Sequence, residues 1–166
     1  MVVPYRTAQN VGTAIYNVFS MLVDDQTLWI AAFQRGIEAV DLKSRTVKSY
    51  LADPSDPSSR VFVLFRSSSG RIWAGTSVGL FYYDRFEDRF VTRDPKVRIS
   101  DITEDHAGRL WIATNEDGLY SYDARTDLLQ HYRYDPDDPA TISRNAVNTL
   151  AAVSYTHLTL PTTPYV

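Results

Sequence analysis

The side chains that could carry chemistry are few and scattered in this 166-residue sequence. His106 falls in a predicted β-turn, His131 near the end of a predicted outer strand, and His157 near the C-terminus; none is spaced with acids as metal ligands are. The absence of cysteine excludes disulfides, thiolate nucleophiles and cysteine-ligated metals. We therefore predict no catalytic, cofactor-binding or metal-binding residue, and the sequence leaves the ligand-binding residues unknown.

Paired acidic residues are the next candidates, because two carboxylates can bind calcium or act as an acid and a base. All four pairs fall in predicted turns, where solvated carboxylates are the more common outcome. We expect that outcome for Asp24-Asp25, Glu104-Asp105, Glu116-Asp117 and Asp137-Asp138.

Two further motifs are weak. The segment SSSGR (67–71) contains glycine and serine but lacks the closing Lys-[Ser/Thr] of a phosphate-binding loop. The aromatic run Phe81-Tyr82-Tyr83 could stack on sugar rings. Strand alternation, however, would place its members on both faces of a sheet, which favours structural packing.

The amino-acid composition argues against several classes of protein. A net charge of -3, from 17 basic and 20 acidic residues, argues against a basic nucleic-acid binder. The hydrophobic share of 44% excludes disorder of the low-hydrophobicity, high-charge kind. No apolar run approaches the roughly 20 residues of a membrane-spanning helix. The N-terminal sequence MVVPYRTAQN lacks the apolar core of a signal peptide.

The elements that must position these side chains come from an internal repeat. Trp29, Trp73 and Trp111 recur at intervals of roughly 40 residues. Two other series of residues keep step with them: Gly36, Gly79 and Gly118, and Asp41, Asp84 and Asp123. The variation in spacing falls in the Pro/Asp-rich segments between units, as expected for loops.

The sequence of each unit predicts about four short strands joined by hairpins. In the second unit, the segments VFVLF, RIWAGT, LFYYD and RFVTR are separated by turns, so a helix of usual length does not fit. Four antiparallel strands per repeat are a propeller blade. We predict an all-β fold, a partial β-propeller with about three four-stranded antiparallel blades and the start of a fourth.

The recurring residues have predicted structural roles. The small residues after each tryptophan, such as Gly75, suggest a strand near the propeller axis, where neighbouring blades crowd together. Each tryptophan should fill the wedge between adjacent sheets, so that replacing a buried Trp111 by alanine would cost about 3–5 kcal/mol. The recurring aspartates at strand ends should accept hydrogen bonds from the backbone of the following turn.

The third unit, EDHAGRLWIATNEDGLYSYD, followed by DPDDPATISRNAVNTL, resembles the two-component regulator propeller repeat of hybrid two-component sensor histidine kinases of Bacteroides-like bacteria. The resemblance covers about residues 15–150. The second unit departs from the pattern by having Ser67-Ser68-Ser69 where an acidic residue is usual, and the first by having Gln26 near the usual turn glycine.

This resemblance implies a fragment of a periplasmic, non-catalytic sensor domain in an inner-membrane protein whose kinase modules lie elsewhere. The implied ligand is an oligosaccharide. The expected partners are neighbouring blades absent from this chain and a second copy of the full protein, and neither nucleic acid nor a membrane segment is expected here. Two alternatives stay open: a propeller lyase or hydrolase with its active site in missing blades, and a protein-interaction propeller.

The repeat divides the chain into six parts. These are the end of a preceding blade or a linker (1–14), blade 1 with a DP-rich linker (15–59), blade 2 (60–95), blade 3 with a DP-rich linker (96–145), the start of a truncated blade (146–152) and a tail (153–166). The tail, VSYTHLTLPTTPYV, resembles a translated transposase sequencing adapter and is predicted not to be encoded by the organism; a Thr/Pro-rich linker is the alternative. An open arc of blades should expose apolar faces that favour association.

Overall fold

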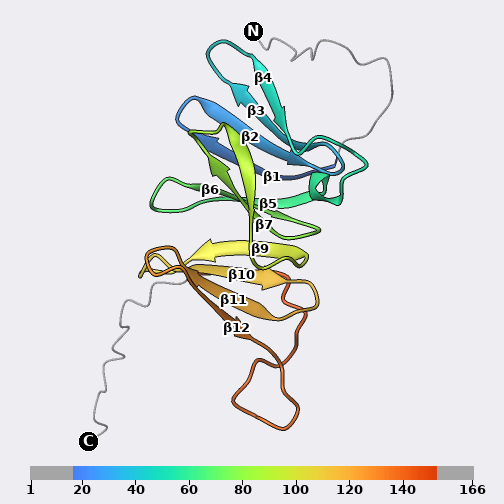
Figure 1. Cartoon of the computed structure of the whole chain (residues 1–166), viewed down its shortest axis with the longest axis vertical. Helices are drawn as coiled ribbons and strands as arrows, with labels where there is room; N and C mark the ends of the chain where they lie inside the picture. The colour runs from blue at the N-terminus through green and yellow to red at the C-terminus, as the bar shows by residue number, and fades with distance from the viewer. Residues whose placement is uncertain (1–16, 153–166) are drawn as a thin grey trace, which may run out of the picture.

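The computed structural model describes residues 17–152 and consists of three four-stranded antiparallel sheets that follow one another in chain order (Figure 1). The strands are β1 (Val18–Asp24), β2 (Thr27–Ala32), β3 (Gly36–Asp41), β4 (Val47–Tyr50), β5 (Val61–Arg66), β6 (Ile72–Thr76), β7 (Leu80–Asp84), β8 (Arg89–Arg93), β9 (Ile99–Glu104), β10 (Leu110–Thr114), β11 (Leu119–Asp123) and β12 (Leu128–Tyr132), with one 3₁₀ turn, η1 (Pro57–Ser59). We call the sheets blade 1 (β1–β4), blade 2 (β5–β8) and blade 3 (β9–β12). The predicted all-β fold with three four-stranded blades is confirmed.

Some predictions concern residues at the two ends of the chain. The tail at 153–166, His157 and the segment 1–14 lie outside the described residues. Between residues 17 and 152, no helix is long and apolar enough to cross a membrane.

The third hairpin of each blade begins at a recurring aspartate. The carboxylate of Asp41 accepts the backbone N–H groups of Lys43 and Ser44 at 2.9 and 2.6 Å. Asp84 accepts those of Phe86 and Glu87, and Asp123 accepts that of Arg125. These carboxylates satisfy turn amides that have no strand partner, which confirms the predicted role of the strand-end aspartates.

The blades meet along their first strands. Strand β5 packs beside β1 and β2, and β9 packs beside β5 and β6, so β1, β5 and β9 are the innermost strands. One hydrophobic core lies between blades 1 and 2, and a second lies between blades 2 and 3. Blade 2 therefore buries both of its faces, whereas blades 1 and 3 each bury one face against blade 2.

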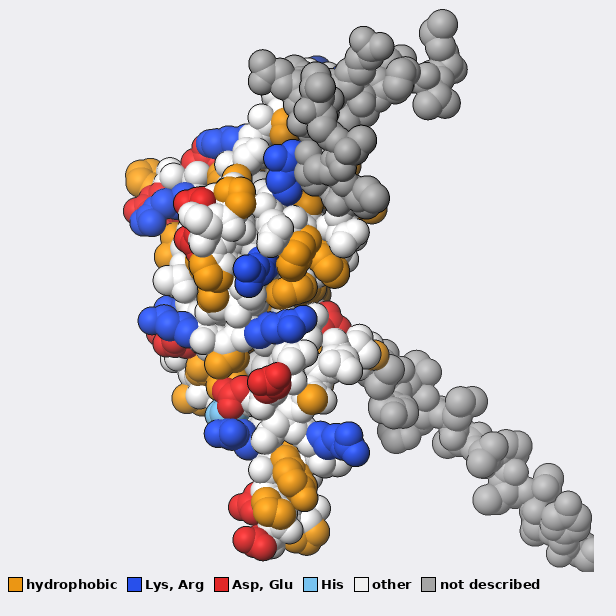
Figure 2. Space-filling model, turned by 90° about the vertical axis from the view of Figure 1, so that its right-hand side faces the viewer, with side chains coloured by type: hydrophobic (Ala, Val, Ile, Leu, Met, Phe, Trp, Pro, Cys, Tyr) orange, Lys and Arg blue, Asp and Glu red, His pale blue; other side chains and the backbone are white. Residues whose placement is uncertain are grey.

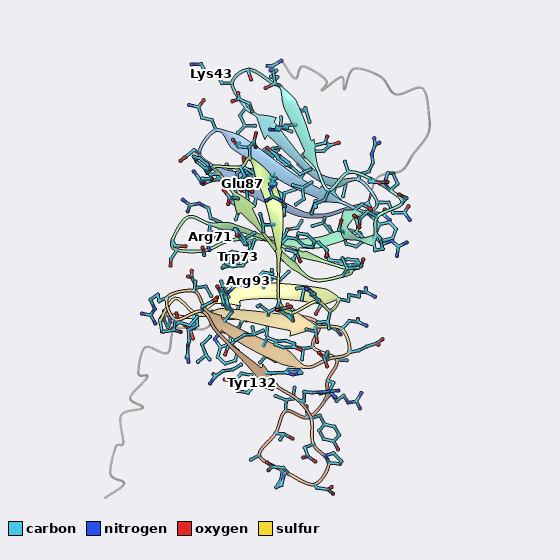
Figure 3. All side chains as sticks on the ribbon, in the orientation of Figure 1. Lys43, Arg71, Trp73, Glu87, Arg93 and Tyr132 are labelled. Carbon is cyan, nitrogen blue, oxygen red and sulfur yellow. The ribbon has the colours of Figure 1, made fainter. Side chains whose placement is uncertain are left out.

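Two of the three tryptophans fill the predicted wedges. Trp29 is 4% exposed and its ring lies 4.8 Å from that of Tyr83 in blade 2. Trp73, labelled in Figure 3, is 1% exposed. The centre of its ring lies 5.8 Å from that of Tyr122 in blade 3. Trp111 is only half-buried, so its predicted burial is wrong. The reason is its position on the outer face of blade 3, where no described sheet follows.

Gly75 shows why the residues after tryptophan are small. A Cβ atom at this position would stand 2.6 Å from Cγ2 of Ile99 in blade 3 and 2.6 Å from Cγ1 of Val63. Ile99 is 0% exposed. The predicted crowding near the axis is thus a contact between this glycine and the first strand of the next blade.

Charged side chains also join the blades. Asp24 of blade 1 is 8% exposed and forms ion pairs with Arg66 and Arg85 of blade 2, both at 2.7 Å. Glu104 of blade 3 accepts hydrogen bonds from the backbone and hydroxyl of Ser68 in blade 2. For these two acids the expectation of solvated turn carboxylates is wrong, because both hold neighbouring sheets together.

The first face of blade 1 is exposed. Met21 is 66% exposed and Val23 is 59% exposed on β1. The residue equivalent to Met21 is Leu64 in blade 2 and Ile102 in blade 3, and these are 7% and 3% exposed. Met21 therefore occupies an interface position that no other described sheet covers.

Candidate ligand-binding site at the axial end

A cluster of aromatic rings and a guanidinium group spans all three blades. The ring of Phe19 in β1 lies 5.9 Å from that of Phe33, in the turn after β2, and 5.5 Å from that of Phe62 in β5. The guanidinium of Arg98, directly before β9, lies 4.7 Å from the centre of the Phe62 ring. We call these four residues the axial cluster.

Backbone irregularities place the axial cluster on the innermost strands. Each of these strands has a bulge at the same position, and the unpaired residues are Phe19, Phe62 and Ser100. A bulge removes one residue from the alternation between sheet faces and turns its side chain in a new direction. The bulged phenylalanines of blades 1 and 2 thus contact each other instead of entering the two cores.

The cluster is accessible to solvent. Phe19 is 49% exposed, Phe33 and Phe62 are partly buried, and Arg98 is exposed. On the face of the molecule shown in Figure 2, hydrophobic side chains gather near the middle, with Lys and Arg side chains beside them. Exposed aromatic rings beside cations form a surface that can hold a ligand with an apolar face and a negative charge.

A hollow of about 430 Å³ adjoins Arg98. Its lining residues are Val97, Arg98, Thr114, Asn115, Glu116 and Asp117. The backbone N–H of Asn115 donates to the carbonyl of Arg98 at 3.2 Å, which fixes the β10–β11 turn against the start of β9. The hollow and the axial cluster therefore share Arg98.

Asp117 at the edge of this hollow has several partners. It accepts a hydrogen bond from the Tyr120 hydroxyl at 2.6 Å, and its carboxylate lies 3.7 Å from Nε2 of His131 and 3.6 Å from Nε of Arg133. Burial, followed by the hydrogen bond to Asp117, raises the pKa of Tyr120. The His131 ring stacks on Tyr120 at 4.0 Å. The phenol therefore stays protonated near neutral pH and serves as a donor.

A second hollow, of about 410 Å³, lies on the outer rim between blades 2 and 3. Arg93 and Asp127 line it and form an ion pair with each other. The Tyr122 hydroxyl also donates to Asp127, at 2.9 Å. Because these groups satisfy each other, the outer hollow is the weaker candidate.

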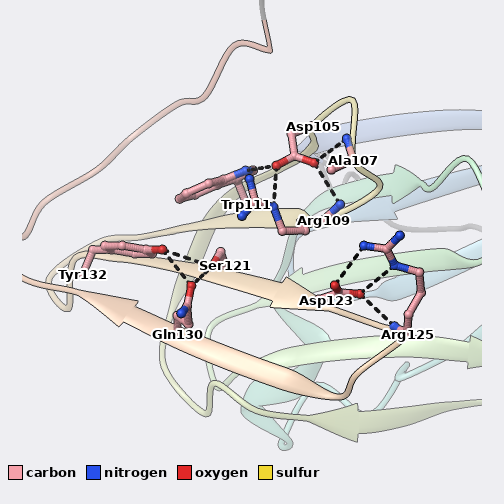
Figure 4. Close-up of polar contacts among 9 residues, drawn as sticks. All are labelled: Asp105, Ala107, Arg109, Trp111, Ser121, Asp123, Arg125, Gln130 and Tyr132. Atoms are coloured by element: carbon pink, nitrogen blue, oxygen red, sulfur yellow. Dashed lines mark hydrogen bonds and ion pairs between the residues drawn. The ribbon is translucent and has the colours of Figure 1, made fainter.

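Asp105, in the turn between β9 and β10, is also held by hydrogen-bond donors of the protein. Asp105 accepts hydrogen bonds from the indole of Trp111 at 3.0 Å and from the backbone and guanidinium of Arg109 (Figure 4). Although desolvation opposes the shift, these bonds lower the pKa of Asp105 to about 2. Asp105 and Asp117 are thus not the freely solvated carboxylates that the sequence suggested, because protein donors hold both.

The remaining sequence candidates have structural positions. His106 lies in the β9–β10 turn and His131 lies on β12, as predicted. Phe81 and Tyr83 pack against the core between blades 1 and 2, whereas Tyr82 packs against the core between blades 2 and 3. The run Phe81-Tyr82-Tyr83 is therefore packing, as alternation indicated. Among the described residues, no group of three or more metal-ligating side chains comes together.

Sequence reasoning missed the axial cluster and the contacts of Asp117. A signal is present in the sequence, since Phe19 and Phe62 occupy the same place in two repeats. The approach of Asp117 to His131 joins residues of two hairpins. Spacing along the chain gives no sign of that contact.

Comparison with known proteins extends these observations. Residues 94–116 match the sequence profile of the family described as two component regulator propeller. Histidine kinase P4 of Formosa agariphila is 34% identical over 97 residues, which are 49% of this chain and 7% of the relative. The chain thus spans less than a tenth of that curated relative.

Solved structures share the fold. The extracellular domain of a putative hybrid two component system from Bacteroides thetaiotaomicron superposes with a TM-score of 0.65 at 24% identity, over 76% of this chain and 16% of that one. Virginiamycin B lyase from Staphylococcus aureus gives a TM-score of 0.58 at 15% identity, over 80% and 46%. At these identities the likeness concerns the fold alone. Residues 94–116 thus match a two component regulator propeller repeat, in a chain whose three described sheets are blades of a β-propeller.

Proposed function

We propose that this chain is part of the extracytoplasmic, ligand-sensing propeller of a hybrid two-component histidine kinase, and that it recognises an oligosaccharide without catalysis. The observation that carries the proposal is the match of residues 94–116 to the two component regulator propeller family. The similarity to a histidine kinase over 97 residues points in the same direction. The expected location is the periplasm, in line with the extracellular domain that shares the fold.

The arrangement of side chains supports binding over turnover. The titratable groups near the axial end, such as Asp117 and Tyr120, are bonded to each other. The axial cluster itself offers phenyl rings and a guanidinium, which bind and orient a ligand but do not transfer protons at neutral pH.

A propeller lyase is the second candidate, because virginiamycin B lyase shares the fold. The two candidates differ in what happens to the bound molecule. A sensor segment returns its ligand unchanged, whereas a lyase converts it.

Titration calorimetry of the 166-residue chain with a panel of glycan oligosaccharides tests the proposal, followed by mass spectrometry of each mixture. We expect saturable binding of at least one oligosaccharide, with every sugar recovered intact. Cleavage of a bound sugar, or of virginiamycin B added in parallel, would contradict the proposal. Sequencing the contiguous gene should reveal a downstream membrane helix and kinase modules.

A further inference from the structure

Two arginines, one of them in the axial cluster, occupy equivalent positions directly before two neighbouring inner strands. Arg60 directly precedes β5, and Arg98 directly precedes β9. The carbonyl of Arg60 accepts the N–H of Ser77 at 3.0 Å, just as that of Arg98 accepts the N–H of Asn115. The same backbone contact thus holds both arginines at the start of neighbouring inner strands.

Neither guanidinium is neutralised within residues 17–152. The ion pairs of this part of the chain involve other arginines, and both Arg60 and Arg98 are exposed. Arg98 instead lies over the Phe62 ring. An arginine held by its backbone and by an aromatic ring loses less side-chain freedom when it binds an anion.

The aromatic rings of the axial cluster are partly exposed to solvent and could contact a ligand. The Phe19 and Phe62 rings meet at an interplanar angle of 68°, edge to face, and half of Phe19 is exposed. A phenyl ring offers no hydrogen bond, so it selects a partner with an apolar face, such as the C–H face of a pyranose ring.

The carboxylates of the adjoining hollow determine where an anion can bind next to Arg98. Glu116 and Asp117 line the hollow together with Arg98, and the guanidinium of Arg98 also lies 4.7 Å from the centre of the Phe62 ring, which is not among the lining residues. An anion is repelled from the acidic side and attracted to the guanidinium. Its favoured position is beside Arg98, over the phenylalanines.

We propose that Phe19, Phe62 and Arg98 form a binding site for an anionic sugar, with the pyranose face on the phenyl rings and the carboxylate or sulfate group on the guanidinium. Arg60 adds a second positive charge at the rim. This inference rests on the proposed function and adds the location of the ligand and its charge.

The test is titration calorimetry of the 166-residue chain with three probes: a disaccharide with a terminal glucuronate, the same disaccharide with glucose in that position, and benzoate as an aromatic acid. We expect the glucuronate probe to bind at least about 10-fold more tightly than the glucose probe. Its binding should weaken with added salt, because the guanidinium contact is exposed.

Matched variants locate the site. Phe62→Ala and Arg98→Gln should each weaken glucuronate binding about 10-fold. Phe86→Ala and Arg45→Gln should leave it unchanged, since Phe86 is 98% exposed on an outer turn and Arg45 lies in the turn before β4. Phe62→Leu, with a similar volume and no aromatic ring, serves if the alanine variant fails to fold, which circular dichroism reports.

Each other outcome overturns the inference. Unchanged glucuronate binding in Phe62→Leu and Arg98→Gln would show that the sugar binds at another place on the chain, and would leave the proposed function intact. Equal binding of the two disaccharides would remove the role of charge, and binding of benzoate alone would replace the sugar by an aromatic acid. If none of the probes binds, the anionic-sugar assignment fails, whereas the oligosaccharide panel still tests the sensor proposal.

Discussion

The carboxylate of Asp101 accepts the backbone N–H of Leu150 at 2.8 Å. The equivalent residue in blade 1 is Ser20, because each pairs with the alanine two positions after the tryptophan of its blade. The Ser20 hydroxyl accepts the N–H of Leu64 in β5 at 3.0 Å. The segment that contains Leu150 thus makes the contact that the first strand of a following blade makes, which supports the proposal that residues 146–152 begin a fourth blade.

Removal of Trp73 should destabilise the chain more than removal of Trp111. Trp73→Ala empties a fully buried site between two blades and should lower the free energy of unfolding by about 3–5 kcal/mol. Trp111→Ala should lower it by less, because this side chain is already partly exposed. Urea unfolding followed by circular dichroism measures both. Equal losses would contradict the assignment of Trp73 to the wedge.

Gly75→Ala should destabilise the contact between blades 2 and 3. The added methyl group would overlap Ile99 and Val63, and such overpacking costs about 1–3 kcal/mol. Ile99→Ala in the same chain removes the contacted Cγ2 atom and should relieve part of that cost. A double-mutant cycle by urea unfolding gives the coupling energy, and strictly additive effects would show that the two residues do not press on each other.

The two neighbouring acids of the first turn should behave differently. Asp24→Asn breaks two ion pairs with blade 2 and should cost about 1–3 kcal/mol, since the carboxylate is buried although its partners are partly exposed. Asp25→Asn is the matched control: the residue is exposed and has a φ of 52°, which asparagine tolerates. Thermal unfolding of both variants measures the difference, and a loss at Asp25 as large as that at Asp24 would refute the role of the ion pairs.

Acid should weaken blade 3 through Asp105. Its pKa of about 2 lies below the value near 3.9 of an unfolded aspartate, so its contribution to stability is present above about pH 4 and is lost as the pH falls toward 2. Asp105→Asn should therefore flatten the dependence of stability on pH in this window. Urea midpoints measured from pH 5 to pH 2.5 test this, and parallel curves for the two proteins would contradict it.

The exposed face of β1 should promote association. Met21→Glu places a charge on this face and should lower the apparent mass in size-exclusion chromatography and light scattering. Phe86→Glu removes an even more exposed side chain, on an outer turn away from the blade faces, and should have no such effect. A monomeric parent chain would contradict the prediction.

Periodic features were predictable from sequence, and contacts between repeats were not. The spacing of Trp29 and Trp73 predicted the blades, and the aspartates at strand ends followed from the chemistry of turns. The ion pairs of Asp24 depend on the separation of two sheets, and the contacts of Asp117 on how two hairpins approach each other. A bulge that turns Phe62 toward the axis shifts the register by one residue, which the hydrophobic pattern of a uniformly apolar strand does not reveal.

Because each blade touches only its neighbours, blade 2 is the only described sheet covered on both faces. In such an array, local opening starts at the ends and moves inward. Amide hydrogens in β6 should therefore exchange with deuterium most slowly, and those of β1 and β12 most rapidly. The middle blade would then be the last part of the chain to open, and opening of the outer blades would separate Phe19 and Arg98 from Phe62.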